Sequence, residues 1–543
     1  MSDIEIVAKP CARDELLEVV GRHANRESVM SDSRILPKFL DISMGECVPQ
    51  YRELYSISDL HLGGASPRNQ IFCQGKRLKA FVESLAAKPG PLALVIAGDL
   101  FDSLPYLTGT GAYIAIDGAA AIVDMVMADA SFLPVFEGLE TFLRNDGHEL
   151  IILIGNHDLE IALAETQEQI LNRIAPTSAA RGRVRFSTGG AGFRCRVNDW
   201  TVYVTHGNEA DPWNHVDHEA LRKAAHARAL GQPFNARTWV PNAGTKLVID
   251  AMNAIKENYP FVDLLKPESK AAVKALTVLA PKELWALFDA LPAFADAAWA
   301  HAGPHVVLGP GREVVTTEEP EVLRLLGEAS RSAFQFGDTP GAALHKRVSG
   351  LQEQGKRPAD LVSDDRGTLG YPRVLWDRFT GRDPAETLRD ALRDWVETDR
   401  SFTLDDRDSV CSGILSQLGP GIDVVITGHT HLPRWITARE RDLVYLNSGA
   451  WARVIGLRNE FLANADAFRP VHEALKARDL AELDSARVTV GAAVLPLVLD
   501  ATAAAHVVRQ ATGMVAELVR ITQTGQVVHE APVDRDKSIL EWR

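Results

Sequence analysis

Metal-binding side chains gather in five short motifs along this chain. The motifs are Asp59-Leu60-His61, Gly98-Asp99-Leu100-Phe101-Asp102, Gly155-Asn156-His157-Asp158, His206-Gly207 and Gly428-His429-Thr430-His431. Each motif follows a run of apolar residues, so each is expected at the carboxyl end of a buried strand, where open α/β folds place their sites. Aspartate, histidine and asparagine together suit borderline divalent metals, and a cluster this rich can hold two of them.

The motifs differ in how specific they are. A single D-x-H or G-D-x-x-D can be an ordinary turn. The third motif is more specific, because glycine lets the backbone turn and Asn156, His157 and Asp158 follow at once. In the fifth motif, His429 and His431 are expected to point the same way from an extended backbone, so that adjacent metals can take one each. All five motifs in order favour a metal centre over a set of turns and caps.

A repeating pattern of strand, motif and helix is expected to position these residues. Predicted strands cover Leu54–Ser58, Leu92–Ala97, Glu149–Ile154, Trp200–Thr205, Asp423–Thr427 and Val444–Asn447. Predicted helices cover Arg77–Ala87, Ala119–Ala128, Val135–Arg144 and the later segment Phe468–Leu483. Hairpins are predicted for Val184–Ser187 with Phe193–Val197, around Gly189-Gly190, and for Val515–Thr522 with Gln526–His529.

The pattern stops between the fourth and fifth motifs, which predicts four regions. These are an N-terminal extension (1–50, with a helix over Asp14–His23), a first core segment (51–208), a mostly helical insertion (209–420) and a second core segment (421–543). Helices are predicted in the insertion over His218–Leu230, Thr245–Glu257, Glu283–Leu291, Glu321–Ala329 and Ala385–Glu397. Both ends of the insertion emerge beside site motifs, which favours a cap over the site; a bundle packed to one side is the alternative.

The composition is that of a soluble globular protein of several domains, with 543 residues, 46% of them hydrophobic and 24% charged. The net charge of −14, without any Lys/Arg run, disfavours nonspecific binding to long nucleic acids, although a local basic groove stays possible.

Several features predict a cytoplasmic protein with no membrane span. The five cysteines are scattered without C-x-x-C spacing, which favours reduced thiols. The first fifteen residues are rich in charge, unlike a signal peptide. The longest apolar stretches, Ala492–Leu499 and Ala501–Val508, are far shorter than the roughly 20 residues that a spanning helix needs.

The motif set resembles that of the calcineurin-like metallophosphoesterase superfamily, over residues 51–208 and 421–460. The resemblance implies an α/β fold, a two-sheet αββα sandwich, here with a large, mostly helical insertion. It also implies ligands for two metals: Asp59, His61, Asp99 and His431 for the first, and Asp99 as a bridge with Asn156, His206 and His429 for the second. His157 would protonate the leaving oxygen or stabilise transition-state charge, with Asp102 fixing its ring.

The expected activity is hydrolysis of a phosphate mono- or diester by a hydroxide held at two divalent metals, with Mn²⁺ the first choice and iron or zinc as alternatives. A capped site favours a small phosphorylated compound such as a nucleotide. A nuclease acting on short or single-stranded ends is the alternative. A catalytically retired scaffold is disfavoured, because every ligand position and His157 are present.

Single residues disfavour two known subfamilies of this superfamily. Ser/Thr protein phosphatases carry arginine and glutamate where this chain has Ser103 and Asp158, and UDP-diacylglucosamine hydrolases carry arginine in place of His157. The sequence leaves open the ester class, the native metal, the role of the insertion and the oligomeric state.

Overall fold

The structure is a computed structural model that describes residues 48–64, 69–233, 239–266, 275–276, 278–280, 383–396, 400–477, 479–529 and 539–541. The helices predicted over Asp14–His23, Glu283–Leu291 and Glu321–Ala329 lie outside the described residues.

A seven-stranded sheet carries the first three motifs, in the strand order β17-β16-β15-β2-β4-β6-β7. Its parallel half consists of β2 (Glu53–Ile57), β4 (Leu92–Ala97), β6 (His148–Leu153) and β7 (Val184–Ser187). Its antiparallel half consists of β15 (Ala503–Gln510), β16 (Gly513–Ile521) and β17 (Val527–His529). The parallel strands are continuous apolar runs, as is typical of strands buried on both faces.

A six-stranded sheet carries the other two motifs, in the order β1-β8-β9-β10-β12-β11. The strands are β1 (Gln50–Tyr51), β8 (Phe193–Val197), β9 (Trp200–Val204), β10 (Val424–Thr427), β12 (Leu443–Asn447) and β11 (Arg434–Ala438). Strands β9 and β10 are parallel neighbours, although the whole insertion separates them in the sequence. Two short pairs, β3 (Leu62–Gly63) with β5 (Phe101–Asp102) and β13 (Arg487–Val490) with β14 (Ala493–Pro496), complete the strands.

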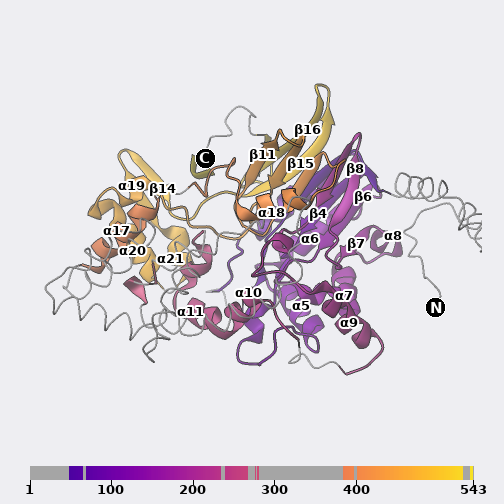
Figure 1. Ribbon diagram of the computed structural model, residues 1–543, viewed down its shortest axis with the longest axis horizontal. Coiled ribbons are helices and arrows are strands. Elements are labelled where there is room, and N and C mark those ends of the chain that lie inside the picture. Colours follow the sequence, from indigo (N-terminus) through magenta and orange to yellow (C-terminus); the bar gives the residue numbers. More distant parts are fainter. Residues whose placement is uncertain are drawn as a thin grey trace, which may run out of the picture.

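The two sheets face each other across a shared apolar layer, and helices cover both outer faces (Figure 1). Side chains such as Val95 and Ile151 from one sheet meet Val204 and Ile426 from the other. Helices α4 (Gly75–Ala86), α5 (Ala119–Ala128), α6 (Leu133–Phe142) and α7 (Ala164–Ile174) pack on the seven-stranded sheet, and α18 (Ser409–Gln417) packs on the six-stranded one. The predicted αββα sandwich is therefore confirmed.

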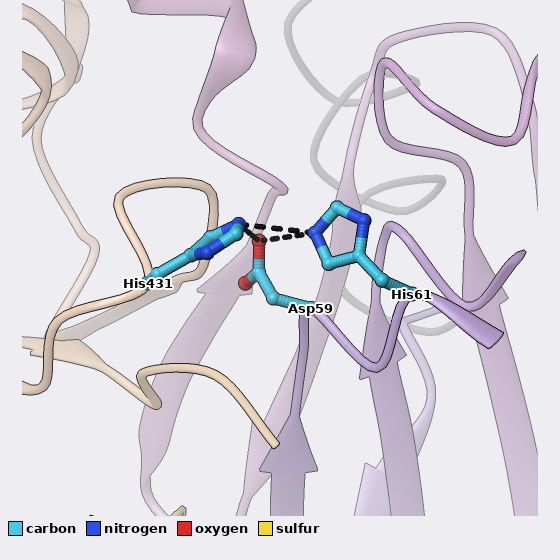
Figure 2. A group of neighbouring side chains, drawn as sticks. All are labelled: Asp59, His61 and His431. Carbon is cyan, nitrogen blue, oxygen red and sulfur yellow. Dashed lines mark hydrogen bonds and ion pairs between the residues drawn. The ribbon is translucent and has the colours of Figure 1, made fainter. Parts of the chain in front are cut away.

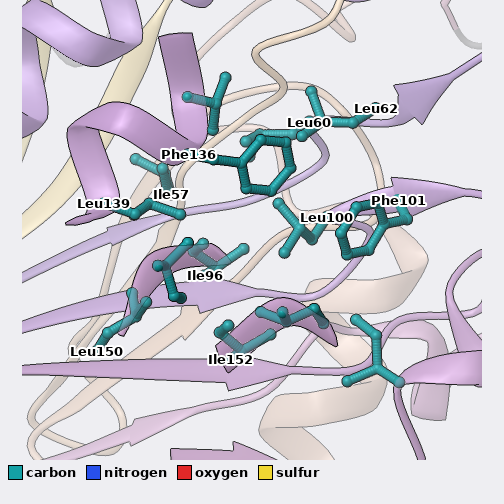
Figure 3. Close-up of a cluster of buried hydrophobic side chains, with 14 of the residues drawn as sticks. Ile57, Leu60, Leu62, Ile96, Leu100, Phe101, Phe136, Leu139, Leu150 and Ile152 are labelled. Atoms are coloured by element: carbon teal, nitrogen blue, oxygen red, sulfur yellow. The ribbon is translucent and has the colours of Figure 1, made fainter. Parts of the chain in front are cut away.

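Short elements connect this sandwich. They are η1 (Leu104–Leu107), η2 (Leu159–Ala162), α8 (Ser178–Arg181), η3 (Asn208–Ala210), α9 (His218–Ala229) and η8 (Ile539–Glu541). Figure 3 shows the outer apolar layer, where Ile57, Ile96 and Ile152 from neighbouring strands meet Phe136 and Leu139 of α6. The same layer holds the apolar residues of the first two motifs, which fixes the loops that carry the site.

A helical lobe lies beside the sandwich, at the left of Figure 1. From the insertion it contains α10 (Ala243–Leu247), η5 (Val248–Met252), α11 (Asn253–Asn258), η6 (Pro260–Leu264) and α17 (Pro384–Val396). From the segment after the fifth motif it contains α19 (Asn459–Leu462), α20 (Ala465–Lys476), α21 (Leu480–Ser485) and the β13–β14 hairpin. The two segments share one apolar cluster, so residues 455–497 pack with the insertion and not between the sheets.

The predicted hairpin of Val184–Ser187 with Phe193–Val197 is wrong. Strands β7 and β8 do not form a hairpin, because β7 adds to the edge of the seven-stranded sheet beside β6 while β8 pairs with β9 in the other sheet. The turn at Gly189-Gly190 thus carries the chain from one sheet to the other. The segment Phe468–Leu483 is helical as predicted and consists of two helices, because Ala477 is extended and Asp479 starts α21 by accepting a hydrogen bond from the Ala481 amide.

No single helix among the described residues is long and apolar enough to cross a membrane. The bent pair α5 and α6 reaches the required length and composition only when the two are taken together, and the apolar side chains of both pack in the core.

Candidate metal centre

The first candidate ligand group joins the first and last motifs. Asp59 and His61 follow β2, and His431 follows β10 of the other sheet. The His431 Nε2 atom lies 3.3 Å from Asp59 Oδ1 and 3.0 Å from His61 Nε2 (Figure 2). All three side chains are nearly buried, so three metal-ligating atoms converge on one point that water hardly reaches.

The second group is built around Asp99, which follows β4. Its Oδ2 atom lies 3.2 Å from His206 Nε2 and 3.6 Å from His61 Nε2. Asp99 therefore stands between His61 of the first group and His206 of the second. A carboxylate in this place can bridge two cations and offset their mutual repulsion.

Besides His61 Nδ1, two buried atoms of this region have no hydrogen-bond partner: His206 Nε2 and Asn156 Oδ1. Buried polar atoms in proteins are almost always hydrogen-bonded, so both atoms need an explanation. His206 Nδ1 lies 2.8 Å from the carbonyl oxygen of Ala97, which orients the ring and leaves the Nε2 lone pair facing Asp99. A metal ion beside Asp99 would satisfy His206 Nε2, and the loop that carries Asn156 contacts Asp99 through the His157 amide. The donor set therefore fits the expected group.

The backbone at the ligand positions is unusual. Asp59, His61, Asp99, His429 and His431 all have positive φ, between 50° and 69°. Among the described residues other than glycine, only Asn198 and Asp442 share this conformation. Residues in this sparsely populated region concentrate at functional sites, where surrounding structure holds them in place. The expectation that His429 and His431 project from an extended backbone is wrong, because β10 ends at Thr427 and both residues lie in left-handed turns.

Glycines let the ligand loops approach one another closely. A Cβ atom at Gly98 would collide with the ring of His206, and one at Gly155 would collide with the carboxylate of Asp99. The glycines that open the second and third motifs thus each make room for a ligand from a different motif.

His429 is the candidate ligand with a different surrounding. Its ring centroid lies 5.2 Å from that of His206, and its Nε2 atom lies 2.9 Å from Asp211 Oδ2. A carboxylate on one ring nitrogen is the usual support of a metal-bound histidine, which leaves Nδ1 as the atom for a metal. In the sequence, the only signal for this role of Asp211 is that it follows His206 by five residues.

His157 and Asp102 form a pair at the edge of the ligand cluster. The His157 Nδ1 atom lies 3.2 Å from Asp102 Oδ1, and the His157 ring packs edge-on against His61 at 4.7 Å. Burial alone would lower the pKa of His157, but the charges of Asp102 and Asp99 raise it to about 9. These two carboxylates thus favour the protonated ring of His157, and Asp102 fixes its orientation.

Other polar residues support the motif loops without pointing at the cluster. Asp158 accepts hydrogen bonds from the amides of Gly155 and Leu100, which ties the third motif to the second. Burial and the nearby Asp99 raise the pKa of Asp158 to about 7. Glu209 accepts a hydrogen bond from the amide of Gly207 and so fixes the turn after His206.

The comparison with known families agrees with a metal centre at this place. Residues 54–258 match the family model of the calcineurin-like phosphoesterases, which supports a metallophosphoesterase domain in this part of the chain. The family implies metal-dependent hydrolysis of phosphoesters. No curated protein and no solved structure matches the chain. The fifth motif lies beyond the matched residues, and the parallel pairing of β10 with β9 brings it to the site.

Proposed function

We propose that this protein hydrolyses a phosphate ester at two divalent metal ions, with Mn²⁺ the first choice. The first ion would be held by Asp59, His61, Asp99 and His431, and the second by Asp99, Asn156, His206 and His429. The observation that carries the proposal is the position of Asp99 between His61 and His206, beside two buried donor atoms without partners.

The bound ions would supply charge for the phosphoryl oxygens and an activated water for in-line attack on phosphorus. The contribution of the chain itself is positioning and proton transfer. His157 stands beside His61 at the edge of the cluster, where the carboxylates of Asp102 and Asp99 favour its protonated form. It can therefore donate that proton to the leaving oxygen, while Asp102 offsets the charge of the ring before transfer.

A small phosphorylated compound is the substrate class that fits best. The net charge of −14 is unfavourable for a long polyanion, and elements of the insertion stand beside Asp102. A nuclease would instead need a basic groove running past the ligand cluster, and that remains the alternative.

The test is turnover by metal-stripped protein resupplied with Mn²⁺, using p-nitrophenyl phosphate and bis-p-nitrophenyl phosphate side by side. Metal-dependent release of p-nitrophenol is expected from one of the two, and the preferred ester separates monoesterase from diesterase. The exposed Asp466 provides a matched control, because Asp466→Asn makes the same change as Asp99→Asn far from the cluster. Turnover that survives Asp99→Asn, or that needs no metal, would refute the proposal.

A further inference from the structure

The insertion begins with a turn that contacts two candidate ligands of the second metal ion. In this turn Asp211 Oδ1 accepts a hydrogen bond from the Trp213 amide at 2.9 Å, and Asp211 Oδ2 accepts one from Asn214 Nδ2 at 2.7 Å. The same Oδ2 atom lies 2.9 Å from His429 Nε2. Asn214 Oδ1 accepts a longer hydrogen bond, of 3.4 Å, from Asn156 Nδ2. One series of hydrogen bonds thus runs from Asn156 through the insertion to His429.

The carboxylate of Asp211 sets the direction of every side-chain hydrogen bond in this series. An ionised carboxylate can only accept, so Asn214 turns its Nδ2 atom towards Asp211 and its Oδ1 atom towards Asn156. Asn156 then donates through Nδ2, and its Oδ1 atom is the one left without a partner. In the other direction, His429 carries a proton on Nε2, which leaves the lone pair on Nδ1. Asp211 therefore frees one metal-ligating atom on each of the two candidate ligands.

Both ends of the series lie where the second ion is expected. The amide of His157, the residue after Asn156, donates to Asp99 Oδ1 at 2.9 Å. The ring of His429 lies edge-on to that of His206, whose Nε2 atom is 3.2 Å from Asp99 Oδ2. The atoms that Asp211 frees thus belong to residues that adjoin Asp99 and His206.

The turn is also fastened to the rest of the insertion. The Gly244 amide, in the first turn of α10, donates to the carbonyl oxygen of Trp213 at 2.7 Å, and the Trp213 side chain packs against the apolar cluster of the helical lobe. Gly244 lies so close to Asn214 that a Cβ atom there would collide with Asn214 Oδ1. The position of the Asn214 side chain therefore depends on how α10 packs.

Resting on the proposed function, we infer that the insertion completes the second metal position, with Asp211 and Asn214 as positioning residues for His429 and Asn156. Within the part of the chain that the structure describes, neither positioning residue is hydrogen-bonded to a candidate ligand of the first ion. Disturbing them should therefore weaken binding of the second ion and leave the first in place. Supporting contacts of this kind typically change metal affinity by about 10-fold to 100-fold.

The experiment counts the Mn²⁺ ions that the whole protein holds. Metal-stripped protein is dialysed against a series of Mn²⁺ concentrations, and bound metal is measured by mass spectrometry. Wild type should bind two ions, and Asp211→Asn should raise the dissociation constant of the second ion by about 10-fold to 100-fold without changing that of the first. At an intermediate concentration, electron paramagnetic resonance should show coupled Mn²⁺ pairs in the wild type and isolated Mn²⁺ in the variant. Asp217→Asn is the matched control, because Asp217 accepts its hydrogen bond from the Ala220 amide at the start of α9.

A second variant tests the link to α10 without altering any residue of the hydrogen-bonded series. Gly244→Ala should displace the Asn214 side chain and weaken the second ion as Asp211→Asn does, although alanine is the better helix former. Gly419→Ala is its control, because nothing lies within 4 Å of a Cβ atom at that position.

The outcomes separate this inference from the proposed function. Unchanged affinity for the second ion in either test variant, equal weakening of both ions, or the same loss in a control variant would overturn the inference and leave the proposed function standing. A wild-type protein that binds two ions but hydrolyses neither p-nitrophenyl ester would overturn the proposed function and not the positioning role. A wild-type protein that never holds a second ion would overturn both.

Discussion

Strand β2 has a cluster of histidines and carboxylates at each end, and the two clusters are built very differently. Beyond the carboxyl end of β2 lies the metal centre, to which Asp59 contributes a candidate ligand. At its amino end lies what we call the Glu53 cluster, which consists of Glu53, His506, Glu517 and His529. The ends are about 20 Å apart, given the length of a strand between Glu53 and Asp59.

The Glu53 cluster is satisfied internally. The ring of His506 bridges Glu53 at 2.9 Å and Glu517 at 3.0 Å, and His529 reaches Glu517 at 2.8 Å. Lys88 contacts Glu53 at 2.6 Å. The three residues on β15, β16 and β17 lie in regular antiparallel pairing, and none of the four residues has positive φ.

The metal centre has the same residue types but the opposite properties, since three of its buried polar atoms lack hydrogen-bond partners and five of its residues have positive φ. The comparison shows that histidines and carboxylates lying close together do not by themselves indicate a metal site. Buried polar atoms without hydrogen-bond partners, on residues with positive φ, do indicate such a site. Both features lower the stability of the fold, so a functional reason is needed for them to persist.

The largest effect is expected at the bridge between the two ligand groups. Asp99→Asn removes the charge that both ions would share, so kcat should fall by at least about a thousandfold. Metal content measured by mass spectrometry should fall in the same variant. If the variant kept full metal content and full activity, the buried atoms without hydrogen-bond partners would not mark a metal centre, and the contrast with the Glu53 cluster would be wrong.

A somewhat smaller loss is expected at the proton donor. His157→Ala should lower kcat by about a hundredfold to a thousandfold while metal content stays unchanged. The loss should be greater for glycerol 3-phosphate than for p-nitrophenyl phosphate, because p-nitrophenol leaves without needing a proton. The exposed His226 on α9 serves as control, and an equal loss for both esters would exclude the proton-donor role.

A substitution in the Glu53 cluster should lower the free energy of unfolding and leave kcat unchanged. Glu517→Gln leaves His506 and His529 facing a neutral amide, which should lower the free energy of unfolding by about 3 kcal/mol, as for a broken buried ion pair. Urea denaturation measures this change, and kcat per folded molecule should match the wild type. A loss of activity at unchanged stability would show that the cluster takes part in the reaction.

The smallest effect is a pH dependence of stability. Burial would raise the pKa of Glu53, but hydrogen bonds from His506 and Lys88 lower it to about 2, against 4.5 for the free side chain. Because the folded pKa is the lower one, the stabilisation is complete above pH 4.5 and is lost as the pH falls towards 2. It amounts to at most about 3 kcal/mol. The difference in unfolding free energy between wild type and Glu53→Gln should shrink over this range, and a constant difference would contradict the assignment.

The strands of the sandwich could be predicted well wherever the signal was local. Leu92–Ala97 is confirmed residue for residue as β4, because a continuous run of apolar side chains bounded by polar residues is typical of a central parallel strand. By contrast, β15 was not predicted, since its Ala503-Ala504-Ala505 segment has low strand propensity and becomes a strand only by pairing with β2 and β16.

The site likewise has features that the sequence predicted and features that it did not. The order of the motifs predicted that Asp59, His61, Asp99, His206 and His431 would meet at one edge, and the structure brings these five together. The contact between His429 and Asp211 and the anchoring of Asn253 on η1 could not be predicted, because each depends on how the insertion packs against the core. The left-handed turns also gave no signal, since aspartate and histidine occupy many other conformations.

The pairing of β2 has a consequence for the order in which the protein is made. Strand β2 carries the first motif, yet its neighbour on one side, β15, is translated only after Ala503. Until then β2 is the outer strand of an incomplete sheet, with its amides open to any other extended chain, and nascent protein should be prone to aggregate at this edge. Catalytic competence and resistance to aggregation should therefore be acquired together, late in synthesis, when the antiparallel strands close over β2.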